Sequence, residues 1–137
     1  MCPHLRTLLL AGALAGVGLV HAAAPAVIQK GYEAAAREAA QSFNGFSAER
    51  GAQFFQARHG NDWSCASCHT ANPMRQGRHT RTSKAIAPLA PAANAERFTD
   101  AANVEKWFRR NCNDVVGRER SAGEKADVLA WLTTLKK

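Results

Sequence analysis

The stretch that decides the fold is SCASCHT, residues 64–70. It places Cys65 and Cys68 three positions apart and His69 directly after them, which is the C-x-x-C-H signature of c-type haem attachment. Two thiols at this spacing can add to the two vinyl groups of one porphyrin, and the adjacent imidazole can then reach the iron from the same side. The stretch therefore predicts one covalent haem c per chain, bound through Cys65 and Cys68, with His69 as an axial iron ligand.

Other chemistry uses the same residue types. A four-ligand zinc site is one alternative, and its ligands would be Cys65, Cys68, His79 and Cys112. A dithiol redox pair is another, but it is typical of a βαβ unit, and the sequence has no strand-like alternation of any length. A chance match to the motif is the third. The haem interpretation is favoured because an export leader, a helical pattern and a shortage of core residues occur together with the motif.

The chain begins with a leader-like segment. A short basic stretch, MCPHLR, precedes the apolar run TLLLAGALAGVGLV and the small residues HAAAPA, in the order of a secretory signal peptide. The apolar run is shorter than the ~20 residues that a membrane span needs. We expect a cleaved signal peptide over residues 1–23, a periplasmic protein and no membrane insertion of the mature chain; an uncleaved anchor is the alternative.

Composition narrows the class of protein further. Without the leader, the chain keeps Cys65, Cys68 and Cys112, an odd number that does not suit a disulfide scaffold. The formal charge falls from +7 to +6, because Arg6 is the only charged side chain of the leader. This basicity suits an acidic partner or a cofactor that carries carboxylates. Without a compact Lys/Arg motif, nucleic-acid binding is not expected.

The rest of the sequence predicts an all-α domain with a long irregular loop. Residues 24–46 are expected to form a helical N-terminal extension, and residues 47–137 the haem domain. The expected helices are 31–43, 48–59, 100–116 and a last one after Ser121, and the irregular loop is 64–94. A packed loop of about thirty residues is unusual unless it encloses something. A large apolar cofactor would explain both the loop and the small core.

Two helix faces resemble those of class I cytochromes c. Gly51 and Phe55 share a face of the helix before the motif, and an apolar face on the last helix holds Val128, Trp131, Leu132 and Leu135. In that class of fold, a glycine and an aromatic residue on the first helix pack across the last helix. Ordinary helix packing would produce the same pattern, so these faces indicate the fold and not the function.

The sixth iron ligand is the open question, because it decides what the iron can do. An electron-transfer cytochrome of this class uses a methionine far beyond the motif, but Met74 lies only five residues past His69. His79 lies in a basic run that suits haem propionates or solvent, and His59 precedes the motif. The other candidates (Met1, His4 and His21) lie in or beside the leader.

Asn111 is the remaining candidate. It shares an apolar face of the helix 100–116 with Val104, Trp107, Phe108 and Val115, and we expect Trp107 and Phe108 to contact the haem. A buried amide that is satisfied by backbone groups is the ordinary explanation. If the helix covers the open haem face, Asn111 could instead bind ferric iron weakly and leave on reduction, which would open a site for a diatomic gas.

Three further runs carry a resemblance to a known family: GRHTRTSKAIAPLAP (77–91), RFTDAANVEKWFRRNCNDVVGRE (97–119) and EKADVLAWL (124–132). With them, the chain from Gly51 to Leu135 resembles the sphaeroides haem protein family of asparagine-ligated class I cytochromes c. The resemblance implies that Asn111 is a displaceable sixth ligand, that oxygen or nitric oxide binds in its place, and that a dihaem cytochrome c supplies electrons. In a sister group, the cytochromes c-double-prime, histidine occupies the ligand position.

The chain departs from this family at one position. The family bridges the cysteine after the ligand to a second cysteine about eight residues on, but Arg120 stands there in this sequence. Cys112 is therefore expected to be unpaired, and packing alone would hold the loop 113–121. We expect easier release of Asn111 or a reactive thiol, and thiol titration of the holoprotein should then find one free thiol.

The expected function is an exported monohaem cytochrome c that transfers electrons and binds oxygen or nitric oxide, and not primarily an enzyme. Alternatives are a plain six-coordinate electron shuttle, with His79 as a candidate sixth ligand, and a gas sensor or scavenger with a catalytic output. A basic run after the motif is either a solvated face or a set of propionate partners and a docking surface for an acidic redox protein; it holds Arg75, Arg78, His79, Arg81 and Lys84.

Overall fold

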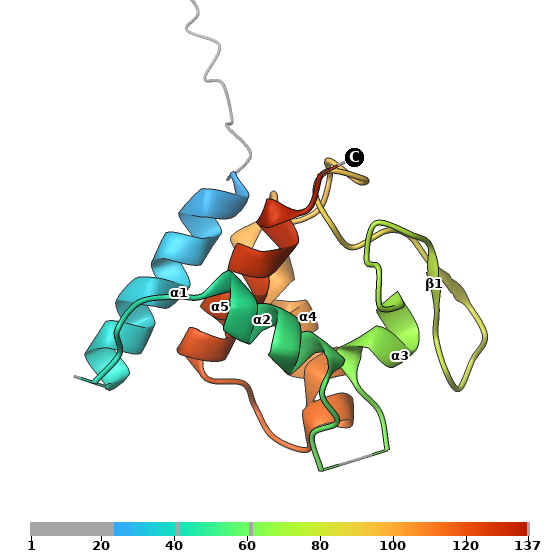
Figure 1. The fold of residues 1–137 in the computed structure, drawn as a ribbon, viewed down its shortest axis with the longest axis horizontal. Coiled ribbons are helices and arrows are strands. Elements are labelled where there is room, and N and C mark those ends of the chain that lie inside the picture. Colours follow the sequence, from blue (N-terminus) through green and yellow to red (C-terminus); the bar gives the residue numbers. More distant parts are fainter. Residues whose placement is uncertain (1–23, 41, 61, 137) are drawn as a thin grey trace, which may run out of the picture.

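A computed structural model describes residues 24–40, 42–60 and 62–136, without the side chains of residues 111–113. The described elements are α1 (Pro25–Ala39), α2 (Ala48–Gln56), α3 (Cys65–His69), β1 (Gly77–Arg78), β2 (Ala85–Ile86), α4 (Ala101–Val116) and α5 (Ala122–Thr134) (Figure 1). The prediction of an all-α protein is confirmed. The predicted signal peptide lies outside the described residues. Within them, no helix is long and apolar enough to cross a membrane.

Several boundaries differ from the sequence-based expectation. The first helix starts at Pro25 and ends at Ala39 instead of spanning 31–43, since proline suits the first turn of a helix. The second ends at Gln56, three residues earlier than expected. The loop 64–94 is not wholly irregular, because it contains α3 and the antiparallel pair β1–β2. These two-residue strands are too short to produce a detectable alternation.

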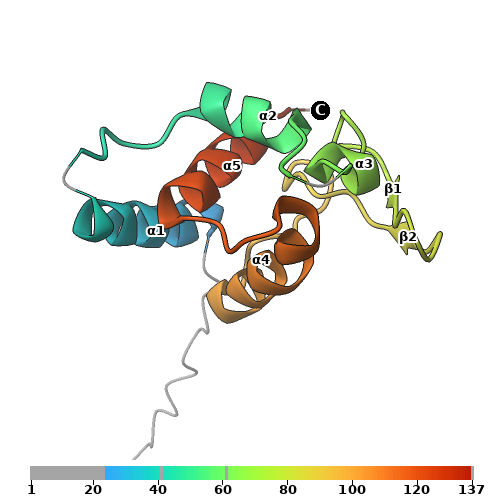
Figure 2. The ribbon, with the colours of Figure 1, turned by 90° about the horizontal axis from the view of Figure 1, so that it is seen from below.

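The core is built on α5, which packs against both α1 and α2 (Figure 2). Phe55 of α2 and Leu129 and Leu132 of α5 are fully buried there. At the crossing, a Cβ atom on Gly51 would overlap the backbone carbonyl of Asp127. The Asp127 carboxylate accepts hydrogen bonds from Ser47 N (2.6 Å) and Arg50 Nε (2.8 Å). The predicted contact of a glycine and an aromatic residue with the last helix is confirmed.

Polar contacts connect α4 to the other helices. The Glu105 carboxylate of α4 accepts hydrogen bonds of 2.8 Å from Tyr32 Oη of α1 and from Lys125 Nζ of α5. Lys125 is only 5% exposed, so this pairing keeps a buried ammonium group satisfied. Burial opposes the charge on Glu105, but the hydrogen bonds from Lys125 and Tyr32 outweigh it and lower the pKa of the carboxyl. The helix α1 thus contributes to holding α4 in place, and the predicted domain boundary after residue 46 stays a prediction.

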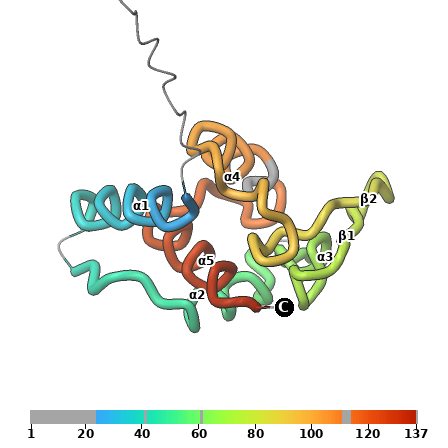
Figure 3. The backbone as a smooth tube through the Cα atoms, turned by 90° about the horizontal axis from the view of Figure 1, so that it is seen from above, coloured from blue at the N-terminus to red at the C-terminus, as the bar shows by residue number. Residues whose placement is uncertain are grey.

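The segment between α3 and α4 extends away from this helical core. The strands β1 and β2 lie at the end of the molecule away from α1 (Figure 3). Gly77 of β1 lies directly against α3, since a Cβ atom there would overlap the carbonyl of Cys68. The segment therefore returns past the motif helix before the chain reaches α4.

Candidate haem-binding site

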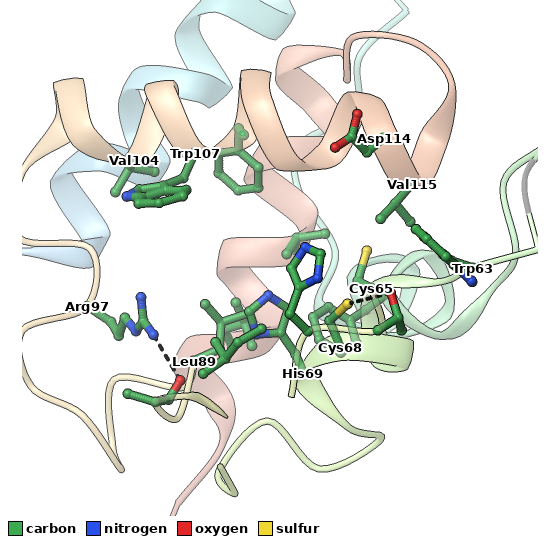
Figure 4. A pocket seen from close by; sticks show the side chains of 18 of the residues that line it. Trp63, Cys65, Cys68, His69, Leu89, Arg97, Val104, Trp107, Asp114 and Val115 are labelled. Atoms are coloured by element: carbon green, nitrogen blue, oxygen red, sulfur yellow. Dashed lines mark hydrogen bonds between the residues drawn. The ribbon is translucent and has the colours of Figure 1, made fainter. Parts of the chain in front are cut away.

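The motif residues lie together on the short helix α3. Ser64 caps this helix: its side chain accepts from the backbone of Ser67, and its own N–H donates to Ser67 Oγ at 2.9 Å. Cys65 is buried, and Cys68 Sγ is 3.7 Å from Thr80 Oγ1. Figure 4 shows Cys65, Cys68 and His69 on one wall of a pocket. The predicted attachment residues and the predicted ligand therefore share a single surface.

That pocket is a cavity of about 540 Å³, within the roughly 300–1,000 Å³ of typical small-molecule and cofactor sites. On the wall opposite α3, Val104 and Trp107 of α4 line it (Figure 4). Phe55, Val128 and Leu132 line it from α2 and α5. Its apolar walls, with two thiols and an imidazole on one side, fit a haem that is attached through the thiols.

Burial sets the protonation of His69. Burial, together with the smaller effect of the positive charges of Arg97 and Arg120, lowers the pKa of His69 to about 4. The imidazole is therefore neutral at neutral pH, which is the form that binds a metal ion. Burial also raises the pKa of the Cys65 thiol, although Arg120 opposes this effect. The motif thus presents a neutral imidazole and a neutral thiol to the cavity.

The α4 wall carries the other predicted site residues. Phe108 and Trp107 line the cavity, and their contact with the haem stays a prediction; Phe108 is buried, whereas Trp107 is 47% exposed. Phe108 and Val115 line the cavity on either side of position 111, three residues before it and four residues after it. The side chain of Asn111 lies outside the described residues, so its role as an iron ligand stays a prediction.

His79 is held in one tautomer. Its Nδ1 atom accepts hydrogen bonds of 3.3 Å from the backbone N–H groups of Arg81 and Thr82. The neutral ring must then carry its proton on Nε2. His79 lines the cavity, but in this tautomer its Nε2 is a hydrogen-bond donor and has no lone pair for iron. This geometry argues against His79 as a sixth ligand.

Only some residues of the basic run line the cavity. His79, Arg81 and Lys84 line the cavity, whereas Arg75 and Arg78 do not. Arg81 lies over the Trp63 ring at 4.9 Å. Among the described residues, no three His, Cys, Asp or Glu side chains could hold a metal ion together. The alternative zinc site would also need Cys112, whose side chain lies outside the described residues.

Two arginines line the cavity that were not predicted from the sequence to lie there. Arg97 lines the cavity and donates from Nε to Pro88 O at 2.9 Å and from Nη2 to Ala87 O at 2.8 Å. Arg120 is only 5% exposed and donates from Nη2 to Cys65 Sγ at 3.0 Å. The only signal at Arg97 was its place at the start of the run 97–119, which carries the family resemblance. The only signal at Arg120 was its place where the resembling family has a cysteine.

These contacts also correct one expectation about the loop after α4. Packing alone was expected to hold residues 113–121, but polar contacts hold them too. Arg118 donates to both carboxylate oxygens of Glu124, at 2.6 and 2.8 Å, and Arg120 binds Cys65. The sequence alone could not show these partners, because the side-chain contacts form only in the folded chain. The state of Cys112 stays a prediction.

Comparisons with known proteins agree with this site. Residues 41–132 match a family described as a domain of unknown function, DUF1924. The chain is 50% identical over 131 residues to cytochrome c-type protein SHP of Cereibacter sphaeroides, which covers 93% of this chain and 96% of that one. It is 46% identical over 80 residues to cytochrome c'' of Methylophilus methylotrophus, covering 58% of this chain and 56% of that one.

Solved structures of both relatives share the fold. The structure of oxidised SHP, described as an oxygen-binding cytochrome c, has a TM-score of 0.72 and 48% identity, covering 82% of this chain and 97% of that one. The structure of oxidised cytochrome c'' has a TM-score of 0.76 and 38% identity, covering 82% and 95%. These likenesses confirm the predicted cytochrome c fold.

Proposed function

Because the chain belongs to the family of cytochrome c-type protein SHP and cytochrome c'', we propose that it is an exported monohaem cytochrome c that transfers electrons and binds a diatomic gas. The observation that carries the proposal is the α3 wall, where Cys65, Cys68 and His69 face a largely apolar cavity. The description of one relative as an oxygen-binding cytochrome c supports the gas-binding part.

The proposed haem is covalent, one per chain, and is held through Cys65 and Cys68. When bound, it supplies one-electron redox chemistry and a site for a small gas. The neutral imidazole of His69 would bind the iron, and Phe55, Phe108 and Leu132 would keep water away from the ring. Arg97 and the Nε2–H group of His79 are the donors that we assign to the haem carboxylates.

We assign the second axial position to Asn111. Two histidines and no methionine are among the described residues that line the cavity, and the tautomer of His79 leaves its Nε2 without a free lone pair. His59 is engaged elsewhere, since its Nε2 lies 2.6 Å from Phe54 O and its ring stacks on that of Phe54. A neutral amide would bind iron weakly, so Asn111 would leave on reduction and free the site for oxygen or nitric oxide.

An absorption spectrum of the dithionite-reduced holoprotein, recorded with and without carbon monoxide, tests this function. We expect a high-spin ferrous spectrum that changes on addition of carbon monoxide, because the weak amide ligand leaves the reduced iron. A pyridine haemochrome spectrum should show one haem with two thioether bonds per chain. A low-spin ferrous spectrum that ignores carbon monoxide would support the plain electron shuttle instead.

Gas scavenging is the second candidate function. The same cavity could serve it, and oxygen or nitric oxide would then be consumed continuously in the presence of an electron donor. Steady-state measurements with a gas electrode distinguish scavenging from reversible gas binding. If the gas binds reversibly and is not consumed, the function is electron transfer with gas binding.

We further propose that a dihaem cytochrome c donates electrons at the basic loop, defined as Arg75, Arg78, Arg81 and Lys84. All four side chains are exposed, as a weak electrostatic encounter requires. We expect the rate of reduction by an acidic dihaem cytochrome c to fall severalfold between low and physiological ionic strength. Replacing Arg75 and Lys84 together by Glu should lower this rate at low salt.

The control is Lys30→Glu, which reverses one charge where the test variant reverses two. Lys30 is exposed on α1, away from the strands that carry the basic loop (Figure 1). The Lys30→Glu variant changes the net charge with the same sign but should leave the rate of reduction by the dihaem cytochrome c nearly unchanged. Electron uptake that is insensitive to ionic strength, or an equal effect of the control, would contradict docking at the basic loop.

A further inference from the structure

Arg120 is a buried cation at the edge of the cavity where Cys65 lies. Its guanidinium group lies between the rings of Phe54 (5.1 Å) and Phe108 (5.3 Å), and Nη2 is 3.0 Å from Cys65 Sγ. Its Nε is buried without a hydrogen-bond partner. A planar cation between two aromatic faces is held firmly in position. With only 5% of its surface exposed, the group is therefore largely shielded from solvent.

The charge on Arg120 is not paired with a carboxylate in the described part of the chain, where no ion pair joins Arg120 to an acidic residue. Two acidic residues, Glu96 and Asp114, line the same cavity, and both are exposed to solvent. The sulfur beside Arg120 is also neutral, because burial raises the pKa of the Cys65 thiol and a thioether carries no charge. At this edge of the cavity, Arg120 thus carries a positive charge that no ion pair of the described residues compensates.

Arg97 differs from Arg120 in its hydrogen-bond partners and in its place in the cavity. It binds two backbone carbonyl oxygens, and Figure 4 places it across the cavity from Cys65. A haem attached through Cys65 and Cys68 would direct its carboxylates away from the thiols, where Arg97 can pair with them. Arg120, at the thiol edge, would keep its charge uncompensated.

We propose that Arg120 places a fixed positive charge against the Cys65 edge of the haem and biases the iron towards its reduced, gas-binding state. This inference rests on the proposed haem. Reduction transfers one electron from a donor, a reduced cytochrome or dithionite, to the iron and lowers the charge at the centre of the ring by one. A nearby cation repels the oxidised form more strongly, and burial makes this repulsion stronger than it would be in water.

The experiment is a spectroelectrochemical titration of holoprotein. Arg120→Met should lower the equilibrium constant for reduction about tenfold or more, which for one electron is a midpoint lower by about 59 mV. Arg120→Lys keeps the charge and should restore most of the shift. If Arg120→Met does not accumulate, Arg120→Gln removes the charge but keeps a donor towards the sulfur, and the same decrease is expected.

Arg118→Met is the matched control. Arg118 lies two residues away and loses the same formal charge, but its side chain is 55% exposed, so solvent and salt screen it. We expect the equilibrium constant for reduction of this variant to stay within about threefold of the wild-type value. An unchanged midpoint in both uncharged Arg120 variants, a shift in Arg120→Lys as large as theirs, or an equal shift in Arg118→Met would overturn the inference. A wild-type protein without attached haem would instead refute the proposed function.

Discussion

Gly51→Ala should destabilise the protein by about 3 kcal/mol or more, at the upper end of the cost of overpacking a core. The added methyl group would overlap the carbonyl group of Asp127 on α5. Backbone atoms cannot move aside as a flexible side chain can, so α2 and α5 must separate. Because a domain is stable by only about 5–15 kcal/mol, this one methyl group removes a large share. Denaturant unfolding of the holoprotein, followed by circular dichroism, measures the loss.

Gly31→Ala is the control for this prediction. Gly31 lies within α1, and a Cβ atom there would meet nothing within 4 Å. Alanine in the interior of a helix is favoured over glycine by roughly 0.5–1 kcal/mol, so this variant should be slightly more stable than wild type. Equal stability of the two variants would show that α2 and α5 are not as closely packed as described.

Asn111→Ala should keep the covalent haem but change the coordination of its ferric iron. Methyl cannot bind iron, so the ferric protein should become five-coordinate or water-ligated, which resonance Raman and electron paramagnetic resonance spectra distinguish from the wild-type state. Added imidazole should then bind ferric protein about tenfold more tightly or better, because no internal ligand has to be displaced first. A wild-type spectrum in this variant would mean that another group occupies the sixth position.

Asn113→Ala provides the comparison for this variant. Position 113 lies about 200° around the helix axis from position 111, so both substitutions remove an amide from the same helix but from different faces. We expect Asn113→Ala to leave the ferric spectrum and the imidazole affinity unchanged. If both variants changed the spectrum alike, loss of order in α4, and not loss of a ligand, would be the cause.

Much of this protein could be predicted from local patterns. The Cys-x-x-Cys-His spacing predicts the attachment chemistry because two thiols and an imidazole so close in the chain can reach one porphyrin. Gly51 and Phe55 were found because residues four apart share a helix face, and the face of α4 that carries Phe108 was found in the same way. Such rules involve neighbours in sequence, so one sequence is sufficient to apply them.

Only the tertiary structure determines which polar groups lie at the cavity and what they contact. Arg120 binds a sulfur 55 positions away in the sequence, and no local pattern marks an arginine that will be buried between two aromatic rings. The proton of His79 was likewise placed by backbone groups of a turn that could not be foreseen. The sequence by itself predicted the cofactor chemistry, through the short Cys-x-x-Cys-His spacing. The folded chain determined the charges and hydrogen-bond donors around the site, because burial and long-range contacts exist only once distant segments meet.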